Sequence, residues 1–245
     1  STLVKSITNE CGLWEMHGDD KSGFEIRHGN RRLPTRFKNL EEAELARKRL
    51  TFDEAFLLQL LLAQRRAEFK AQSATPRKIT TDGLVAKFEA KLPFKYTDGQ
   101  IAVNQEIEKD MQSPHPMHRL LQGEVGSGKT VVALRAALSV IESGGQAALL
   151  APTEVLAQQH FATIKKLLGD LATSGTLGAA DLATKVVLIT GSQSANERKS
   201  ALTDLFSGEA GIAVGTHALL GNEIEFKDLG LIVVDEQHRF GVEQR

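Results

Sequence analysis

The segment GEVGSGKT, residues 123–130, constrains the fold of this 245-residue chain more than any other feature. It matches the pattern G-x-x-x-x-G-K-[ST] at every fixed position. Its glycines permit a tight turn in which several backbone N–H groups converge on phosphate oxygens. Such a loop works between a buried strand and a helix, because the positive end of the helix attracts anions. The motif therefore predicts an α/β domain that binds a nucleoside triphosphate.

The residues of this loop have separate expected roles. Lys129 is expected to reach the β- and γ-phosphates, and the hydroxyl of Thr130 is expected to bind Mg²⁺. The other loop residues are expected to bind the nucleotide mainly through their backbone: Gly123, Glu124, Val125, Gly126, Ser127 and Gly128. The alternative interpretation is a glycine-rich turn between a strand and a helix that binds no ligand.

From residue 119 onward, short apolar runs alternate with segments rich in helix formers. The predicted strands are 119–122, 146–151, 185–190, 211–215 and 229–235, and the predicted helices are 129–142, 154–168 and 194–206. Continuous apolar strands that alternate with helices indicate a parallel sheet covered by helices on both faces. The sequence therefore predicts the α/β fold class.

An acidic pair, Asp235 and Glu236, follows the last of these strands. The C-terminal ends of parallel strands form the edge of a sheet where ligands bind. We expect Asp235 to hold Mg²⁺ and Glu236 to orient and deprotonate the water that attacks the γ-phosphate. A solvated strand end is the alternative, but the phosphate loop in the same α/β unit favours the catalytic interpretation.

The chain before this region divides into segments of different texture. Residues 1–38 are predicted to be irregular, with weak strand potential at 24–27. Residues 39–92 form a predicted linker region with a long helix, and 93–245 form the nucleotide-binding domain. The segment 73–83 is a predicted loop, and a further helix is predicted near 98–112.

The long helix of the linker region is predicted from about residue 40 to residue 72, since this stretch is rich in strong helix formers. Asn39 is placed to cap it. The sequence allows either one helix or two that are separated near Thr51. One apolar face is expected to pack into a core: Leu45, Phe52, Phe56 and Leu60.

Bulk properties exclude several classes of protein. The net charge of −1 argues against nucleic-acid binding by overall charge, so any such contact is expected to be local or to come mainly from parts outside this sequence. The single cysteine, Cys11, excludes an intrachain disulfide and fits a reducing compartment. The most apolar stretch, residues 55–63, is too short to cross a bilayer. A soluble cytoplasmic protein with no membrane partner is expected.

Five segments together resemble successive motifs of the superfamily 2 helicases. They are GEVGSGKT, APTEVLAQQH, TGS, GTHALL and DEQHRFGVEQR. More narrowly, they resemble the bacterial RecG-type ATP-dependent DNA helicases, which remodel branched DNA in recombination and repair. The resemblance extends from about residue 40 to residue 245. It implies a RecA-like first motor domain, preceded by a mostly helical linker, that uses ATP and Mg²⁺.

The resemblance also implies roles for individual residues. Gln100 resembles the glutamine that reads adenine. Gln237 and His238 would couple the γ-phosphate to DNA contact and would join Lys129, Asp235 and Glu236 as catalytic residues. The expected contacts to the DNA backbone lie in three short motifs: Pro152, Thr153 and Glu154; Thr190, Gly191 and Ser192; and Gly215, Thr216 and His217.

The partners implied by the resemblance are branched DNA, selected by its shape, and a second RecA-like domain of the same polypeptide. That domain would supply an arginine to the ATP site, so little steady ATP hydrolysis is expected from this chain alone. A monomer is expected. On the same basis, residues 1–38 are open to a second interpretation, the end of a DNA-gripping wedge domain.

Two alternatives remain open from the sequence. The transcription–repair coupling translocases share an HRFGV segment after their acidic motif, although Gln237 stands where those proteins typically carry a glutamate. A nucleotide-binding module without motor activity is the alternative from a different class.

Overall fold

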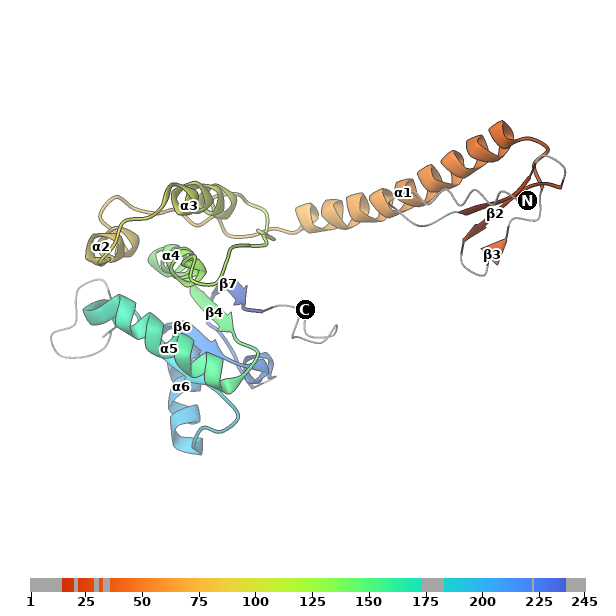
Figure 1. The fold of residues 1–245 in the computed structure, drawn as a ribbon. Coiled ribbons are helices and arrows are strands. Elements are labelled where there is room, and N and C mark those ends of the chain that lie inside the picture. Colours follow the sequence, from red (N-terminus) through yellow and green to blue (C-terminus); the bar gives the residue numbers. More distant parts are fainter. Residues whose placement is uncertain are drawn as a thin grey trace. The chain divides into compact units, whose positions relative to one another are not determined.

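The computed structural model describes residues 15–19, 22–28, 31–32, 36–172, 183–221 and 223–236. Its internal contacts divide the chain into two compact units, residues 1–71 and residues 72–245, and each is described by itself. Figure 1 labels most of their helices and strands.

The first unit contains a small antiparallel sheet where the sequence predicts an irregular segment. Its strands are β1 (Glu15–Asp19), β2 (Gly23–His28) and β3 (Arg31–Arg32), in the order β1-β2-β3. The irregular interpretation is therefore wrong here, and the strand potential noted at 24–27 belongs to β2. Met16 and Phe24 pack with Ala43 of the following helix. The small apolar cluster explains why so polar a segment forms strands.

Helix α1 (Leu40–Ala71) is a single continuous helix. Asn39 caps it, since its Oδ1 accepts a hydrogen bond of 2.9 Å from the N–H of Glu42. Thr51 does not interrupt it, because its hydroxyl donates to the carbonyl of Arg47 one turn earlier, at 3.0 Å. Both the helix and its predicted cap are confirmed, and the two-helix alternative is wrong.

The apolar face predicted for this helix is not buried. Leu45, Phe52 and Phe56 are 62%, 58% and 53% exposed, whereas Ala43, near the helix start, is fully buried. A helix of 32 residues extends about 48 Å at its usual rise, whereas a six-residue strand extends only about 20 Å. Within this unit the sheet therefore covers only the first turns of α1.

The second unit is built on a four-stranded parallel sheet, in the order β5-β6-β4-β7. The strands are β4 (Gln146–Leu150), β5 (Lys185–Ile189), β6 (Ala210–Gly215) and β7 (Leu229–Val234). In the ladders, Leu150 lies opposite both Gly215 and Val234, and Ile189 lies opposite Gly215. All four strands therefore end at one edge, and the predicted α/β fold is confirmed.

Helices cover the sheet in layers. α4 (Lys129–Glu142) and α5 (Glu154–Leu168) share one core cluster with one face of the sheet, and α6 (Ala195–Ser207) packs on the other face. Figure 1 shows α2 (Leu84–Lys91) and α3 (Asp98–Met111) beside α4. α2 contributes Phe88 to the main core, and α3 contributes Ile107 and Met111 to a second cluster with α4. The 3₁₀ turns η1 (Gly169–Ala172) and η2 (His217–Leu220) complete the described elements.

The strand predicted at 119–122 is not formed. Arg119 donates to the carboxylates of Asp110 and Glu106, which holds this segment to α3. Leu120 is 70% exposed, although Leu121 packs with the cluster that includes Leu231 of β7. The segment therefore contacts the edge of the sheet through a side chain and makes no ladder with β7.

The sheet is covered on both faces only in part, which corrects a second expectation. Ile232 and Val234 of β7 are 53% and 39% exposed. Their side chains alternate with Leu231 and Val233, which pack against the helices on the α4 side. α6 covers β5 and β6, so the outward residues of β7 have no covering helix among the described residues.

A buried arginine holds the loop before α2 to the start of the sheet. Arg77 is 5% exposed, and its Nη2 donates to both carboxylate oxygens of Asp228, at 3.0 and 2.8 Å. A Cβ at Gly230 would lie 3.0 Å from this Nη2 and 2.7 Å from a methyl of Val140. The glycine therefore leaves the space that the guanidinium needs beside β7.

Replacing Asp228 with alanine is expected to lower the free energy of unfolding by about 1–3 kcal/mol, because a buried guanidinium loses its carboxylate. This expected loss of stability is smaller than the loss for a fully buried ion pair, because the Asp228 side chain is 47% exposed. Urea unfolding would measure the effect, with Asp82→Ala as the control, since Asp82 is an exposed aspartate of the loop that carries Arg77. Equal losses in the two variants would contradict the assignment.

None of the helices in the described part of the chain is long and apolar enough to cross a membrane.

Candidate nucleotide-binding site

The phosphate loop lies directly before α4 and depends on two glycines in the left-handed region. Gly126 has φ +84° and Gly128 has φ +81°, values that residues with side chains rarely adopt. A Cβ at Gly126 would meet no atom within 4 Å, so that glycine is required only for its backbone angle. A Cβ at Gly128 would also come within 2.5 Å of the Gln100 amide nitrogen. A loop with such turns directs neighbouring N–H groups into one anion-binding concavity.

Lys129 is the first residue of α4 and its ammonium group lies against the phosphate loop. Its Nζ donates to the carbonyls of Gly123 and Glu124, at 2.8 and 2.9 Å. Thr130 follows in the first helical turn and is partly exposed. The positive end of the helix, an ammonium group and a hydroxyl therefore meet at one place, which suits a polyphosphate.

Gln100 joins the start of α3 to the phosphate loop. Its Oε1 accepts from the N–H of Thr97, which is the N-cap of α3, at 3.0 Å. Its Nε2 donates to the carbonyl of Ser127, at 2.9 Å. The structure thus places this glutamine at the predicted site through a contact that the sequence did not indicate, while its contact with adenine stays a prediction.

The acidic strand end lies at the C-terminal edge of β7. The N–H of Asp235 donates to the carbonyl of Leu150 at 2.9 Å, which extends the ladder with β4. Its Oδ2 lies 2.8 Å from Nε2 of His160 in α5. Glu236 is exposed and has φ +52°, an uncommon angle for a residue with a side chain, and such angles cluster at functional sites. Gln237 and His238 lie outside the described residues.

His160 is a residue of the site that sequence reasoning missed. It is the last residue of the motif APTEVLAQQH. The feature of the sequence that could have indicated its role is its place on the helix face that also carries Ala157 and Ile164. Residues three and four apart in a helix share a face, and Ala157 and Ile164 are 0% and 2% exposed. The same face therefore directs His160 toward the interior, where it meets Asp235.

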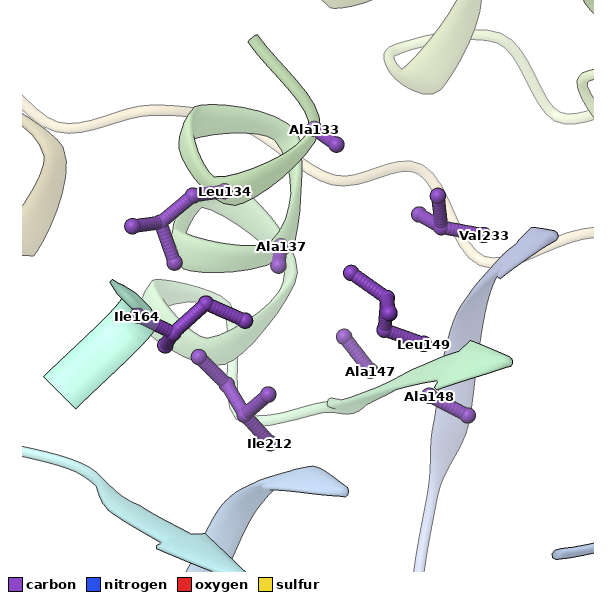
Figure 2. A pocket seen from close by; sticks show the side chains of 9 residues that line it. All are labelled: Ala133, Leu134, Ala137, Ala147, Ala148, Leu149, Ile164, Ile212 and Val233. Carbon is purple, nitrogen blue, oxygen red and sulfur yellow. The ribbon is translucent and has the colours of Figure 1, made fainter. Parts of the chain in front are cut away.

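The phosphate loop and Asp235 lie at the same edge of the sheet. α4 packs against β4, and a short turn connects the end of the helix to the beginning of that strand. The start of α4 therefore lies near the strand ends. Figure 2 shows Ala133, one turn into α4, and Val233, near the end of β7, on the walls of one small hollow.

The hollow in Figure 2 is a gap in the core and not a ligand site. Its walls come from α4, α5, β4, β6 and β7 and include Leu134, Leu149 and Ile212. All nine lining residues are aliphatic. Ligand pockets contain a few polar groups that fix the orientation of the ligand, and this hollow has none.

The residues at the edge fit a magnesium nucleotide. Thr130 and Asp235 offer oxygen ligands, which Mg²⁺ prefers, and the loop offers N–H groups to phosphates. The described residues contain no group of three or more His, Cys, Asp or Glu side chains that could hold a metal ion. Mg²⁺ is usually held by one or two protein groups together with substrate phosphates.

The residues expected to contact DNA follow β4, β5 and β6 at the same edge. Two of them, Thr190 and Thr216, are 1% and 2% exposed. The hydroxyl of Thr153 caps α5 by accepting from the N–H of Leu156, at 3.3 Å. A Cβ at Gly215 would lie 2.2 Å from a carbonyl oxygen of β5, so this glycine allows the strands to end close together. These four residues have structural roles in addition to any contact with DNA.

Glu154 and Ser192 are brought together from two of these motifs. The Glu154 carboxylate accepts from the N–H of Ser192 at 3.2 Å and from its hydroxyl at 2.5 Å. The hydroxyl of Ser192 is the main cause of a lowered pKa of Glu154, and the backbone of Gly191 and the imidazole of His217 lower it further. Pro152 precedes this pair at the end of β4 and is partly exposed.

The lowered pKa predicts a pH-dependent effect of Ser192→Ala. A carboxyl group with a lowered folded-state pKa stabilises the fold above its ordinary pKa of about 4.5, and this contribution is lost as the pH falls through the lower value. The variant is therefore expected to unfold at a lower temperature than the parent at neutral pH and to converge with it in acid. Thermal unfolding from pH 7 to pH 3 would measure this, with Ser200→Ala as an exposed control. A difference that persists in acid would contradict the prediction.

Comparison with known proteins shows that the chain is similar to helicases. Residues 97–245 match the DEAD/DEAH box helicase family. The chain is 51% identical over 200 residues to the ATP-dependent DNA helicase RecG of Mycobacterium leprae, which covers 82% of this chain and 27% of that protein. It is 46% identical over 208 residues to the RecG of a Synechocystis strain, covering 85% and 24%.

One solved structure, of RecG bound to a three-way DNA junction, superposes with a TM-score of 0.72 at 39% identity. The match covers 84% of this chain and 27% of that one. The RecA-like form of the expected α/β fold is thereby confirmed. The chain spans about a quarter of the length of the curated relatives that it matches.

Proposed function

We propose that this chain is the ATP-binding part of an ATP-dependent DNA helicase, because it belongs to the DEAD/DEAH box helicase family. The observation that carries the proposal is the position of the phosphate loop directly before α4, a helix that packs against β4 and β7 with its start toward the edge where β7 ends. An NTPase needs a phosphate cradle and a carboxylate for the metal at one place, and this edge provides both.

The proposed roles follow from the positions of the side chains. The loop N–H groups and Lys129 bind the phosphates. Thr130 and Asp235 would hold Mg²⁺, which would neutralise charge on the transferred phosphoryl group. Glu236 orients the attacking water and accepts its proton. Gln237 and His238 connect the γ-phosphate to the DNA-facing motifs.

Branched DNA is the proposed substrate. The support comes from the RecG relatives and from the RecG structure on a three-way junction, together with the type of groups at this edge. Hydroxyl and backbone N–H groups such as those of Ser192 and Gly191 suit phosphates and read no base sequence. The proposed helicase therefore selects its DNA by shape.

The proposed helicase works as a monomer in the cytoplasm. A second RecA-like domain supplies an arginine to the γ-phosphate.

A chimeric helicase tests the proposal. Residues 40–245 would replace the matching segment of the Mycobacterium leprae RecG, and the unwinding of a three-way DNA junction would be followed with and without ATP. The chimera is expected to unwind the junction only with ATP, and the same chimera with Lys129→Ala is expected to lose unwinding. If the Lys129→Ala chimera still unwinds the junction, the segment is a nucleotide-binding module without motor activity and the proposal fails.

A further inference from the structure

The side chain of Asp235 is held by a residue from a different element. His160 lies in the second turn of α5, and its Nε2 is 2.8 Å from Oδ2 of Asp235. The two side chains are only 18% and 32% exposed, so water screens this contact incompletely. We infer that His160 is a positioning residue for Asp235, whose carboxylate it orients for Mg²⁺. The inference rests on the proposed function, since it assigns Asp235 to the metal.

The direction of the hydrogen bond follows from the chemistry of the two groups. An ionised carboxylate can only accept, so the proton lies on Nε2 of His160 and is donated to Oδ2. This hydrogen bond uses Oδ2 and does not involve Oδ1, the other carboxylate oxygen of Asp235. Because the backbone of Asp235 is held by Leu150 in the β4–β7 ladder, the two contacts together fix both the main chain and the side chain.

The histidine is itself rigidly placed. Ala157 and Ile164, on the same face of α5, are 0% and 2% exposed and belong to the main core. The hydroxyl of Thr153 caps the helix. A metal ligand works best when the residues that support it are locked by packing, and α5 meets this requirement.

The same helix gives His160 a second consequence. α5 begins with Glu154, which is held by Ser192 in the turn after β5. One rigid helix therefore joins the Glu154–Ser192 pair, at the proposed DNA edge, to the carboxylate proposed for the metal.

The experiment compares three substitutions in the 245-residue chain. His160→Ala removes the donor. His160→Gln places an amide N–H the same number of bonds from the backbone as Nε2, and His160→Asn places it one bond short. Binding of the fluorescent nucleotide mant-ADP would be measured while Mg²⁺ is titrated, and also without Mg²⁺. Gln159→Ala, an exposed neighbour in α5, is the control.

His160→Ala is expected to raise the Mg²⁺ concentration needed for half-maximal nucleotide binding by about 10- to 100-fold, the usual effect of losing a group that orients a metal ligand. Binding without Mg²⁺ is expected to stay unchanged. The Gln variant is expected to restore most of the Mg²⁺ dependence, and the Asn variant is not. The inference is overturned if His160→Ala leaves the Mg²⁺ dependence of nucleotide binding unchanged. It is also overturned if His160→Ala lowers both the stability of the chain and its nucleotide binding without Mg²⁺.

A second measurement needs no nucleotide and so separates the two proposals. In a nitrogen–proton NMR spectrum of the histidine rings, His160 is expected to show a proton on Nε2, and Asp235→Asn is expected to shift that signal. If the parent chain binds no nucleotide but this signal responds, the proposed function fails while the positioning contact stands. A His160 signal that ignores Asp235→Asn refutes the contact.

Discussion

Replacing Lys129 with alanine is expected to weaken the binding of ATP about 10- to 100-fold. The ammonium group lies within hydrogen-bonding distance of two carbonyls of the phosphate loop, so it is already placed where the phosphates are proposed to bind. A hydrogen bond to a charged group contributes about 1.5–3 kcal/mol, and every 1.4 kcal/mol is about tenfold in affinity. The loss is therefore expected to be large.

The same argument predicts a dependence on the phosphates of the ligand. Because Lys129 is assigned to the β- and γ-phosphates, the variant is expected to lose affinity for ATP and ADP but little for AMP. Isothermal titration of the three nucleotides would measure this, with Lys166→Ala, an exposed lysine of α5, as the control. Equal losses for all three nucleotides would show that the substitution damages the fold and not a phosphate contact.

Replacing Phe88 with alanine is expected to lower the free energy of unfolding by about 3–5 kcal/mol. Phe88 is 0% exposed and belongs to the main core cluster with Leu138 of α4 and Ile164 of α5. Removing its ring leaves a cavity between α2 and the helices of the nucleotide-binding unit, and a close-packed core collapses into such a cavity only in part.

This substitution also tests whether α2 belongs to the fold of the second unit. Phe94, a few residues later, is 44% exposed, so Phe94→Ala is a matched control in which a loss of less than about 1 kcal/mol is expected. Urea unfolding followed by circular dichroism would measure both. If the two variants unfold alike, α2 is not integral to the core of the second unit.

The sequence predicted the parts of the fold in which local pattern and tertiary packing agree. The parallel strands β4, β5, β6 and β7 are each marked by a continuous apolar run, and α4 follows from the phosphate loop. Because the strands are parallel and aligned, the order of motifs in the chain also predicted which residues meet at one edge. Lys129, Ser192 and Asp235 all lie at elements whose positions were predicted in this way.

Features that depend on distant contacts were not predictable. α2 is short and has no cap side chain, so nothing in its pattern distinguished it from a loop. The apolar residues at 119–122 read as a strand, but Arg119 binds two carboxylates of α3 and the ladder does not form. The apolar stripe of α1 predicts a helix, but it does not tell which part of the protein covers that stripe. The contact of His160 with Asp235 joins residues 75 positions apart.

Glu236 shows what this edge of the sheet requires of the sequence. A glycine or asparagine would adopt its φ of +52° with less strain than a glutamate. A chain selected for durability alone would therefore place a smaller residue here. The proposed catalytic role of Glu236 would account for a glutamate in this strained position, and stabilised versions of the proposed helicase found by unbiased selection are expected to lose ATP hydrolysis first through substitutions of residue 236.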